Sequence, residues 1–464
     1  MLNQHLLYHA QGPIAQAGVI GTGHFATAVV TQAQSMAQLA VRVVVDLKLA
    51  AAQSAYARAG IPEAAIAICE NRRAALDAWE RQKYLILTDA MLLLELPVDV
   101  VVEATGVPEA GARHALAVIE HGKHVVMVTK ETDAVVGPLL AHLAAQAGVV
   151  YAQADGDQHG LLIDLVHWAR TLGLEVLCGG KARDAEFVYT PDSATITCGR
   201  HTVQPPTKAR QWLQPVAPGE AAAFVAARQE LCASLPQVGG FDLVELAIAA
   251  NATGLIPDVE TTHCAALHIA ELPEVFCPME EGGILQRRGV IDCVTCLRQP
   301  HEAGLGGGVF IVVACTNEYS RHILHTKGLI PNSRGTAAVI YRPYHLCGVE
   351  TPLSILRAAL LGADPNLPLP RPVVDVVARA RRTLGRGAIM GNDHSPELQA
   401  RLRPAGAVVA QQPLPLHMAN GNVLQYDVAE GQIIEPQMVI EPPAATLWRL
   451  RRQLDQHFGL GVSS

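Results

Sequence analysis

The stretch of residues 18–26, Gly-Val-Ile-Gly-Thr-Gly-His-Phe-Ala, constrains the fold of this chain more than any other. An apolar run predicts a buried strand over residues 17–20, and a helix is predicted over 26–37. The glycines between them predict a tight turn that a pyrophosphate can approach closely, and Ala26 still lets helix and strand pack. This order of strand, glycine turn and helix indicates dinucleotide binding. The expected cofactor-binding residues of the turn are Gly21, Thr22, Gly23, His24 and Phe25.

A second predicted strand, residues 41–46, ends in an acid about twenty residues past the turn, where a ribose-binding carboxylate belongs. Asp46 favours NAD, because a carboxylate repels the 2′-phosphate of NADP, although Lys48 close by leaves NADP open. The alternative is a glycine-rich turn of another α/β fold, with Asp46 as a surface acid.

Strand-like and helix-like runs alternate from residue 15 to about 154, which predicts an α/β fold with a doubly wound, mostly parallel sheet. Further helices are predicted over 47–59, 71–83, 108–121 and 133–148, and further strands over 84–87, 98–104, 125–128 and 149–152. The later chain mixes helix-like runs (161–172, 243–250) with strand-like runs (174–177, 309–314, 337–341), which is typical of an α+β domain.

The domain organisation follows from these patterns and from a stiff, proline-rich linker at residues 367–372. We expect a loose leader (1–14), a Rossmann domain that binds NAD or NADP (15–158), a central α+β substrate domain (159–368), a small β-rich domain (373–442) that closes with a strand at 438–440, and a C-terminal helix or tail (444–464).

Ligands of doubly wound sheets bind at the carboxyl ends of the strands, and several polar residues follow predicted strands here. Thr105, Gly106 and Lys130 are expected to contact the cofactor. Lys130 would hold a substrate oxygen or act as a general acid beside the nicotinamide, unless it is a solvated lysine at a loop start. Asp155 and Asp157 would orient substrate hydroxyls, act as a base or bind a divalent metal, unless they only cap a helix.

The central domain offers further candidates, each beside an apolar strand or a glycine or proline turn. Lys181 follows two glycines and is a second candidate catalytic lysine. The expected substrate-binding residues are Asn251, Arg288, Arg342 and His345, because arginine binds phosphate or carboxylate through a planar fork. Each could instead be structural, as a surface ion-pair partner or a helix cap.

Composition excludes several classes of protein. A net charge of −8 gives no general attraction to nucleic acid or anionic membranes. No apolar run is long enough to span a membrane, and no signal peptide is evident, so a cytoplasmic protein is expected. Cys293 and Cys296 lack a second pair for a zinc site, and the ten cysteines are expected to be buried thiols.

Residues 122–130, Gly-Lys-His-Val-Val-Met-Val-Thr-Lys, resemble the stretch that ends in the active-site lysine of the homoserine dehydrogenase type of NAD-binding domain. The whole chain resembles a narrower group of oxidoreductases with a distinct central catalytic domain and a C-terminal SAF domain, the DXR-like group. The segments that carry this resemblance are residues 18–23, 178–181, 249–258, 283–289, 341–346, 382–387 and 428–439.

The resemblance implies an NAD(P)-dependent reaction of the 1-deoxy-D-xylulose 5-phosphate reductoisomerase type. The acidic loop at 155–159 and the stretch 293–301 depart from the pattern of the group, which leaves the substrate open.

We therefore expect an oxidoreductase that acts on a small polar, anionic hydroxy or carbonyl substrate and that forms a homo-oligomer. The alternatives are a non-catalytic protein that senses dinucleotides or binds carbohydrate through its SAF domain, and a hydro-lyase.

Overall fold

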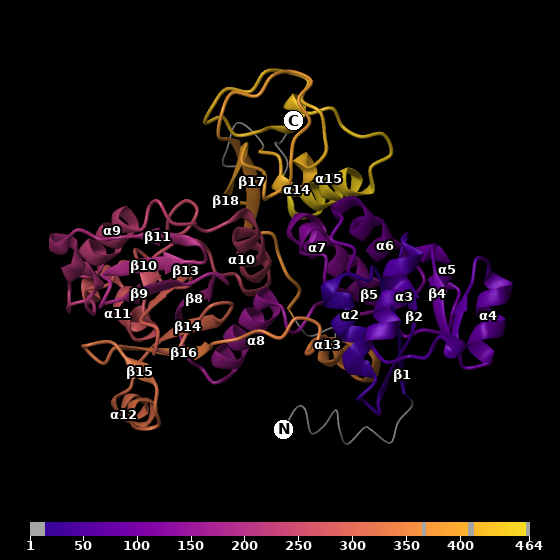
Figure 1. Ribbon diagram of the computed structural model, residues 1–464, viewed down its shortest axis with the longest axis horizontal. Coiled ribbons are helices and arrows are strands. Elements are labelled where there is room, and N and C mark those ends of the chain that lie inside the picture. The colour runs from indigo at the N-terminus through magenta and orange to yellow at the C-terminus, as the bar shows by residue number, and fades with distance from the viewer. Residues whose placement is uncertain (1–13, 364–367, 407–412, 461–464) are drawn as a thin grey trace.

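The structure is a computed structural model that describes residues 14–363, 368–406 and 413–460. Residues 1–13 of the expected leader and the first residue of the expected linker lie outside the described residues. The chain forms two large units side by side, with a smaller C-terminal unit above their junction (Figure 1).

The N-terminal unit is built on a seven-stranded parallel sheet, in the order β3-β4-β2-β1-β5-β6-β7. The strand order reverses at β1, which pairs with β2 on one side and β5 on the other. The predicted doubly wound Rossmann sheet is confirmed. Its strands are β1 (Ala15–Ile20), β2 (Leu39–Val45), β3 (Ile66–Ile68), β4 (Tyr84–Leu87), β5 (Val100–Glu103), β6 (His124–Met127) and β7 (Tyr151–Gln153).

The five predicted helices of this unit are present as α2 (His24–Ala33), α3 (Leu49–Arg58), α4 (Arg72–Glu80), α6 (Pro108–Glu120) and α7 (Lys130–Gln146). Helices α2 and α7 begin earlier than expected, and the short helix α5 (Ala90–Leu94) was not predicted. Helix α7 was predicted from residue 133, yet it begins at Lys130, and acidic side chains in its first turn suit the positive end of the helix dipole. Lys130 is therefore held by a helix rather than by a loop.

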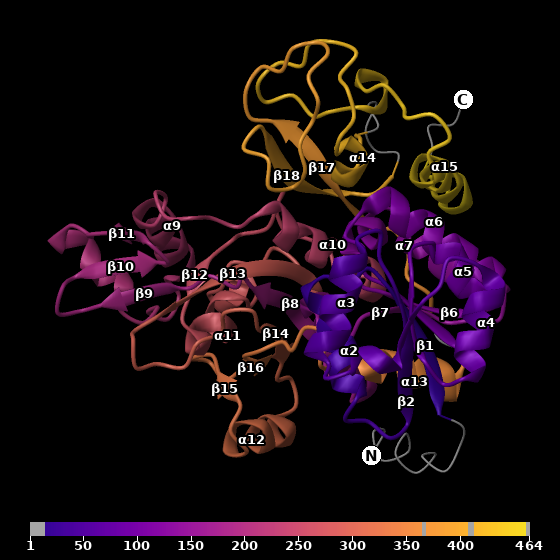
Figure 2. The same cartoon turned by 45° about the vertical axis from the view of Figure 1, so that its right-hand side comes forward.

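One helix that the sequence did not predict lies in the segment assigned to the central domain, and it packs instead on the N-terminal sheet. Helix α13 (Thr351–Leu361) places Ile355, Leu356 and Ala358 in the same buried cluster as β1, β2 and β5. Figure 2 shows α13 against this sheet, far from its neighbours in the sequence. The chain thus returns to the N-terminal unit after it has formed the central unit. This return is not evident from the sequence, because α13 follows the N-terminal unit by about 200 residues.

The central unit is the expected α+β domain, with a nine-stranded mixed sheet ordered β11-β10-β9-β13-β8-β14-β16-β15 and β12 beside β13. Its strands are β8 (Val176–Ala182), β9 (Phe187–Thr190), β10 (Thr195–Cys198), β11 (His201–Val203), β12 (Ala266–Leu267), β13 (Val290–Arg298), β14 (Val309–Ala314), β15 (Ile330–Pro331) and β16 (Ala337–Arg342). Its helices are α8 (Gln158–Thr171), α9 (Ala221–Leu231), α10 (Gly240–Thr253), α11 (Leu272–Val275) and α12 (Glu318–Thr326).

The strand predicted at 174–177 is longer than expected and includes the glycines before Lys181. Any Cβ at Gly180 would lie 2.5 Å from the Phe310 ring, so glycine is needed for the close packing of β8. Lys181 therefore lies inside a buried strand and not in an open turn.

The C-terminal unit is small and β-rich, as predicted, with β17 (Val374–Ala380) paired antiparallel to β18 (Leu398–Pro404), followed by α14 (Leu416–Ala419). The closing strand predicted over 438–440 is wrong, because residues 436–438 form a 3₁₀ turn and Val439 makes only an isolated bridge to Leu424. The final helix is α15 (Thr446–Phe458).

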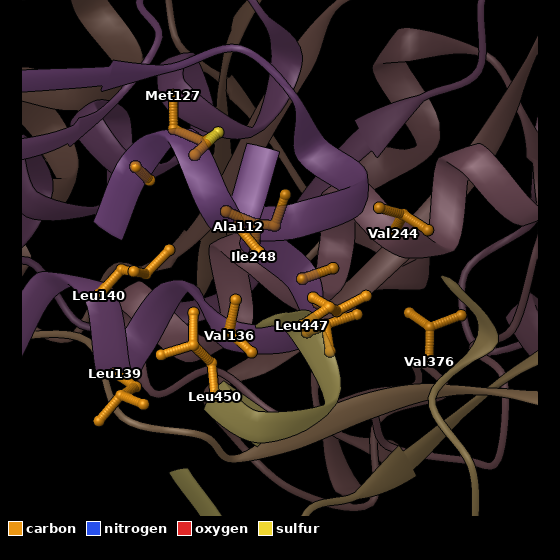
Figure 3. Close-up of a cluster of buried hydrophobic side chains, with 14 of the residues drawn as sticks. Ala112, Met127, Val136, Leu139, Leu140, Val244, Ile248, Val376, Leu447 and Leu450 are labelled. Atoms are coloured by element: carbon orange, nitrogen blue, oxygen red, sulfur yellow. The ribbon is translucent and has the colours of Figure 1, made fainter. Parts of the chain in front are cut away.

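A hydrophobic core crosses all three units. Figure 3 shows Val136 of α7, Ile248 of α10 and Leu447 of α15 within one cluster of buried side chains, to which Val376 of β17 also belongs. All ten cysteines are free thiols, and Cys293 and Cys296 are buried in β13. No helix in the described part of the chain is long and apolar enough to cross a membrane.

Candidate active site

A cavity of about 330 Å³ lies where the carboxyl edge of the N-terminal sheet meets the central unit. The N-terminal unit contributes Gly23, His24, Phe25, Thr105, Gly106, Lys130 and Glu131 to its lining. The central unit and the segment after it contribute Asp157, Gln158, Asp184, Phe241, Glu245, His345 and Cys347. The cavity thus joins the expected cofactor turn to residues about 100 to 300 positions further along the chain.

The glycine turn has the geometry that a pyrophosphate needs. Gly21 has φ +89°, and a Cβ there would lie 2.5 Å from the carbonyl oxygen of Ala104, so only glycine fits. A Cβ at Gly23 would meet nothing within 4 Å, so the space beside it is open. Helix α2 begins at this point without a side-chain cap, which leaves its first N–H groups for an anion.

Asp46 is fixed beside the turn. Its Oδ2 accepts hydrogen bonds from the backbone N–H (2.9 Å) and hydroxyl (2.6 Å) of Thr22, and its Oδ1 accepts one from the Lys48 N–H (2.8 Å). A carboxylate has about four acceptor positions, so one remains for a ribose hydroxyl. The residues of the turn and Asp46 therefore fit a dinucleotide.

Thr105 and Gly106 form the rim of the cavity at the end of β5. The Thr105 hydroxyl donates to Glu103 (2.7 Å), and the Gly106 N–H donates to the hydroxyl of Thr129 (3.0 Å). These bonds fix the two residues, and both line the cavity.

Two lysines and two carboxylates form a connected network that runs from the cavity lining into the interior behind it. Glu245 of α10 accepts hydrogen bonds from both Lys130 and Lys181, and the Lys181 ammonium lies 2.9 Å from Asp242. The Phe241 ring lies 5.8 Å from the Lys130 ammonium and 5.6 Å from that of Lys181. Charges of opposite sign alternate along the network, which is how buried ions are tolerated.

The network holds Glu245 and the two lysines in their charged forms. Burial alone would raise the pKa of Glu245, but the two ammonium groups outweigh it and lower the pKa to about 2. Burial lowers the pKa of Lys130, and Glu245 and Asp157 more than reverse this, so the net shift is upward. Lys130 thus carries a positive charge at neutral pH.

The two lysines differ in access to the cavity. Lys130 lines the cavity, with about a fifth of its side chain exposed, whereas Lys181 is 1% exposed and does not reach it. Lys181 lies behind Glu245, so it can act on a ligand only by fixing that carboxylate.

The two acidic residues after β7 also differ in their access to the cavity. Asp157 lines the cavity and caps α8 by accepting the Gln158 N–H (2.8 Å). Asp155 is not in the lining; its carboxylate is bound by Ser354 (2.9 Å) and Arg357 (3.1 Å) of α13. Asp155 therefore joins α13 to the N-terminal unit, and in the described residues no group of three His, Cys, Asp or Glu side chains is arranged to bind a metal ion.

Of the four expected substrate-binding residues, only His345 lines the cavity, where its Nδ1–H donates to the Gly307 carbonyl (2.7 Å). Asn251 is buried and binds the backbone of Val374, so it holds the start of β17. Arg288 pairs at the surface with Glu175, and Arg342 pairs with Glu350. These three residues lie outside the cavity lining. Each is bonded instead to an acceptor in its own unit or at a domain junction.

The sequence reasoning assigned Glu131 no role of its own and missed four residues of the site: Asp184, Phe241, Asp242 and Glu245. One signal could have found the last two. They stand three positions apart in a helix that is otherwise apolar, and a carboxylate on a buried helix face needs a cation or a ligand.

Two family descriptions match the sequence. Residues 18–153 match the homoserine dehydrogenase NAD-binding domain, and residues 156–351 match the catalytic domain of oxidoreductase DRL. No curated protein sequence matches the chain.

Solved structures resemble the chain only distantly. GenD2 from gentamicin A biosynthesis, in complex with NAD, is 13% identical over 75% of this chain and 87% of its own, with a TM-score of 0.38. A probable dehydrogenase from Thermotoga maritima is 13% identical over 74% and 85%, with a TM-score of 0.34. DOX-P reductoisomerase with fosmidomycin and magnesium is 14% identical over 52% and 58%, with a TM-score of 0.31.

Likenesses at these scores carry no statement about the reaction, and the two domain matches identify the chain. It is an NAD(P)-dependent oxidoreductase that combines an NAD-binding domain of the homoserine dehydrogenase type with a catalytic domain of the oxidoreductase DRL type.

Proposed function

We propose that this oxidoreductase interconverts a carbonyl and a hydroxyl group of a small, hydroxyl-rich substrate, with Lys130 holding the reacting oxygen. The observation that carries the proposal is the position of Lys130, which lines the cavity at the carboxyl edge of the N-terminal sheet while Glu245 keeps it charged. A fixed ammonium stabilises the negative charge that develops on a carbonyl oxygen as it is reduced.

The bound nicotinamide cofactor supplies or accepts the hydride. Gly23 leaves room for its pyrophosphate, and Asp46 would accept a hydroxyl of its ribose. Asp46 favours NAD over NADP, because its carboxylate would face the 2′-phosphate.

The charge of the lining favours hydroxyl groups over an anionic substrate. Lys130 is the only lysine or arginine among the described lining residues, whereas four carboxylates line the same cavity: Glu131, Asp157, Asp184 and Glu245. Carboxylates accept hydrogen bonds from hydroxyl groups and repel anions. The two arginines that were expected to hold an anionic end are paired elsewhere.

A substrate screen tests the proposal. Purified protein is mixed with NADH or NADPH and a panel of neutral hydroxyketones, aldoses and 1-deoxy-D-xylulose 5-phosphate, and loss of the reduced cofactor is followed. We expect turnover of neutral polyhydroxylated carbonyl compounds. Preference for the phosphorylated ketose would instead favour the reductoisomerase reaction that the resemblance implies.

Substitution of the lysine tests the site. Lys130→Met should lower kcat by about 100-fold or more, the usual cost of losing a fixed donor to a developing oxyanion, with little change in NADH affinity. Lys208→Met changes a lysine that is exposed on the central unit and serves as the matched control. Full activity of Lys130→Met on a substrate that the wild type turns over would refute the assignment.

A further inference from the structure

The proposed function leaves open which residue exchanges a proton with the substrate oxygen. Lys130 is tied to Glu245 and is held in its charged form, which suits a group that stabilises charge throughout the reaction. A group that exchanges a proton near neutral pH must be free to exist in both forms.

Glu131 is the neighbouring residue in the first turn of α7, and it also lines the cavity. Within the part of the chain that the structure describes, its carboxylate accepts a hydrogen bond from its own backbone amide and from no other residue. Two of the other three carboxylates of the lining already have partners, since Glu245 binds two lysines and Asp157 caps α8.

The C-terminal unit reaches this part of the cavity wall. Asp393 packs on the start of α10, where a Cβ on Gly240 would lie 3.0 Å from that of Asp393. The next residue, His394, places its ring 5.5 Å from that of Phe241, which lines the cavity. The side chain of Asp393 is only 8% exposed, so its charge is poorly screened by water.

The charges around Glu131 favour its protonated form. Burial raises its pKa most, Asp393 and Asp157 raise it further, and Lys130 lowers it, with a result of about 7. His417 of α14, which packs against α7, is buried, and burial lowers its pKa to about 4, so it is neutral where Glu131 titrates.

We propose that Glu131 exchanges the proton with the substrate oxygen while Lys130 holds that oxygen, and that Asp393 of the C-terminal unit is a positioning residue that acts on Glu131. The inference rests on the proposed function. In reduction, the substrate carbon would gain its new C–H bond from the hydride that a bound nicotinamide supplies, the C=O π bond would open toward oxygen, and Glu131 would give its proton to that oxygen. Glu131 is left as a carboxylate, water reprotonates it, and oxidation runs the same transfers in reverse.

The signs of the pH effects follow from this assignment. Reduction needs protonated Glu131, so its kcat should fall as pH rises through about 7. Oxidation needs the carboxylate, so its kcat should rise over the same range. These two changes of kcat with pH are the limbs of the pH–rate profiles. Removing the negative charge of Asp393 should move both limbs to lower pH.

The experiment compares three variants of the full chain with the panel substrate of highest turnover. Glu131→Gln should lose about 10²–10⁴-fold in kcat, with NADH affinity and KM little changed, and should lack the limb near pH 7. Asp393→Asn should keep most of the activity, with the limb at lower pH. Asp184→Asn removes another carboxylate of the same lining and should leave the limb in place.

A measurement without substrate separates this inference from the proposed function. Infrared difference spectra of the cofactor-free protein should show a carboxyl group that titrates near pH 7 and disappears in Glu131→Gln. Absence of turnover across the panel with this titration present would count against the proposed function alone. Burial also raises the pKa of Asp155 to about 6, so the test is whether the titration near pH 7 loses amplitude in Glu131→Gln. An undiminished titration, or a Glu131→Gln kcat close to that of the wild type, would overturn the role of Glu131.

Discussion

At the scale of the residue, the two glycines of the cofactor turn are needed for different reasons. Gly21 has a positive φ and no room for a Cβ against Ala104, so its role is in folding. Gly23 has ordinary φ (−66°) and open space, so the fold accepts a side chain there. The requirement for glycine at position 23 comes from the ligand.

Gly23→Asp should fold normally and lose cofactor binding, because its carboxylate would occupy the place of the pyrophosphate. We expect NADH affinity to fall by about 100-fold or more, or roughly 3 kcal/mol, in calorimetry. The melting temperature should stay close to that of the wild type. Gly21→Ala, in contrast, should lower the melting temperature because of its contact with Ala104. Unchanged NADH binding by Gly23→Asp would contradict the placement of the cofactor.

Glu245 should also contribute strongly to the stability of the folded protein. Glu245→Gln leaves Lys181 buried with Asp242 as its remaining charged partner in the network, so we expect a loss on the order of 2–3 kcal/mol in urea unfolding. Glu175→Gln breaks an exposed pair with Arg288 and should change stability by less than about 0.5 kcal/mol.

The pH dependence of this loss has a defined sign. Because the pKa of Glu245 is lowered from 4.5 to about 2, its stabilisation is present above pH 4.5 and is lost as pH falls toward 2. The difference in unfolding free energy between wild type and Glu245→Gln should therefore shrink in acid. A difference that is constant with pH would mean that Glu245 is not ionised by its lysines.

At the scale of the element, the C-terminal helix depends on a residue of the N-terminal unit. Helix α15 has no side-chain cap of its own, and its Thr446 and Leu447 N–H groups donate to the carboxylate of Glu109 at 2.7 and 2.9 Å. Glu109 lies in the first turn of α6, so two helix N-termini share one carboxylate. This contact anchors α15 to the cofactor-binding unit.

Glu109→Gln should weaken that anchor. Loss of the charged acceptor should cost about 1 kcal/mol, the usual value of a helix cap, and should increase hydrogen exchange over residues 446–458. Glu120→Gln, an exposed acid at the other end of α6, is the matched control. Equal exchange in the two variants would show that α15 is held by its apolar face alone.

At the scale of the whole molecule, the three units share one large cluster of buried hydrophobic side chains. Figure 3 shows α7, α10 and α15 meeting around the same buried side chains. An ion pair reinforces the last of these contacts, since Arg451 of α15 binds both carboxylate oxygens of Asp375 in β17 at 2.6 and 2.7 Å. Both residues are buried, which makes the pair costly to break from one side.

Arg451→Met should therefore destabilise the protein by about 3–5 kcal/mol, because Asp375 is left as a buried carboxylate without that partner. The double variant Arg451→Met with Asp375→Asn should recover part of this loss. Unfolding should remain one transition for all three units in the wild type. A separate early transition of the C-terminal unit would show that the shared core is not cooperative.

The sequence by itself determined the local architecture. The glycine turn, the alternation of strands and helices and the Asp46 position predicted the N-terminal sheet, because these signals depend only on neighbours in the chain. It also pointed to Lys130, Asp157 and His345, which the structure brings to one cavity. That the C-terminal unit is a SAF domain, and that the protein forms a homo-oligomer, stay predictions.

Only the tertiary structure decided which charges meet. Asp155, Asn251, Arg288 and Arg342 looked like ligands from their surroundings in the chain, but the fold gives each a partner outside the cavity. Glu245 and Asp393 come from a helix and a loop that lie more than 100 residues from Lys130 in the sequence. No local sequence pattern predicts that they are close to Lys130 in space. What a buried charged residue does depends on the charged group it is paired with. For these residues that partner lies far away in the sequence, so it is known only from the packing of the units.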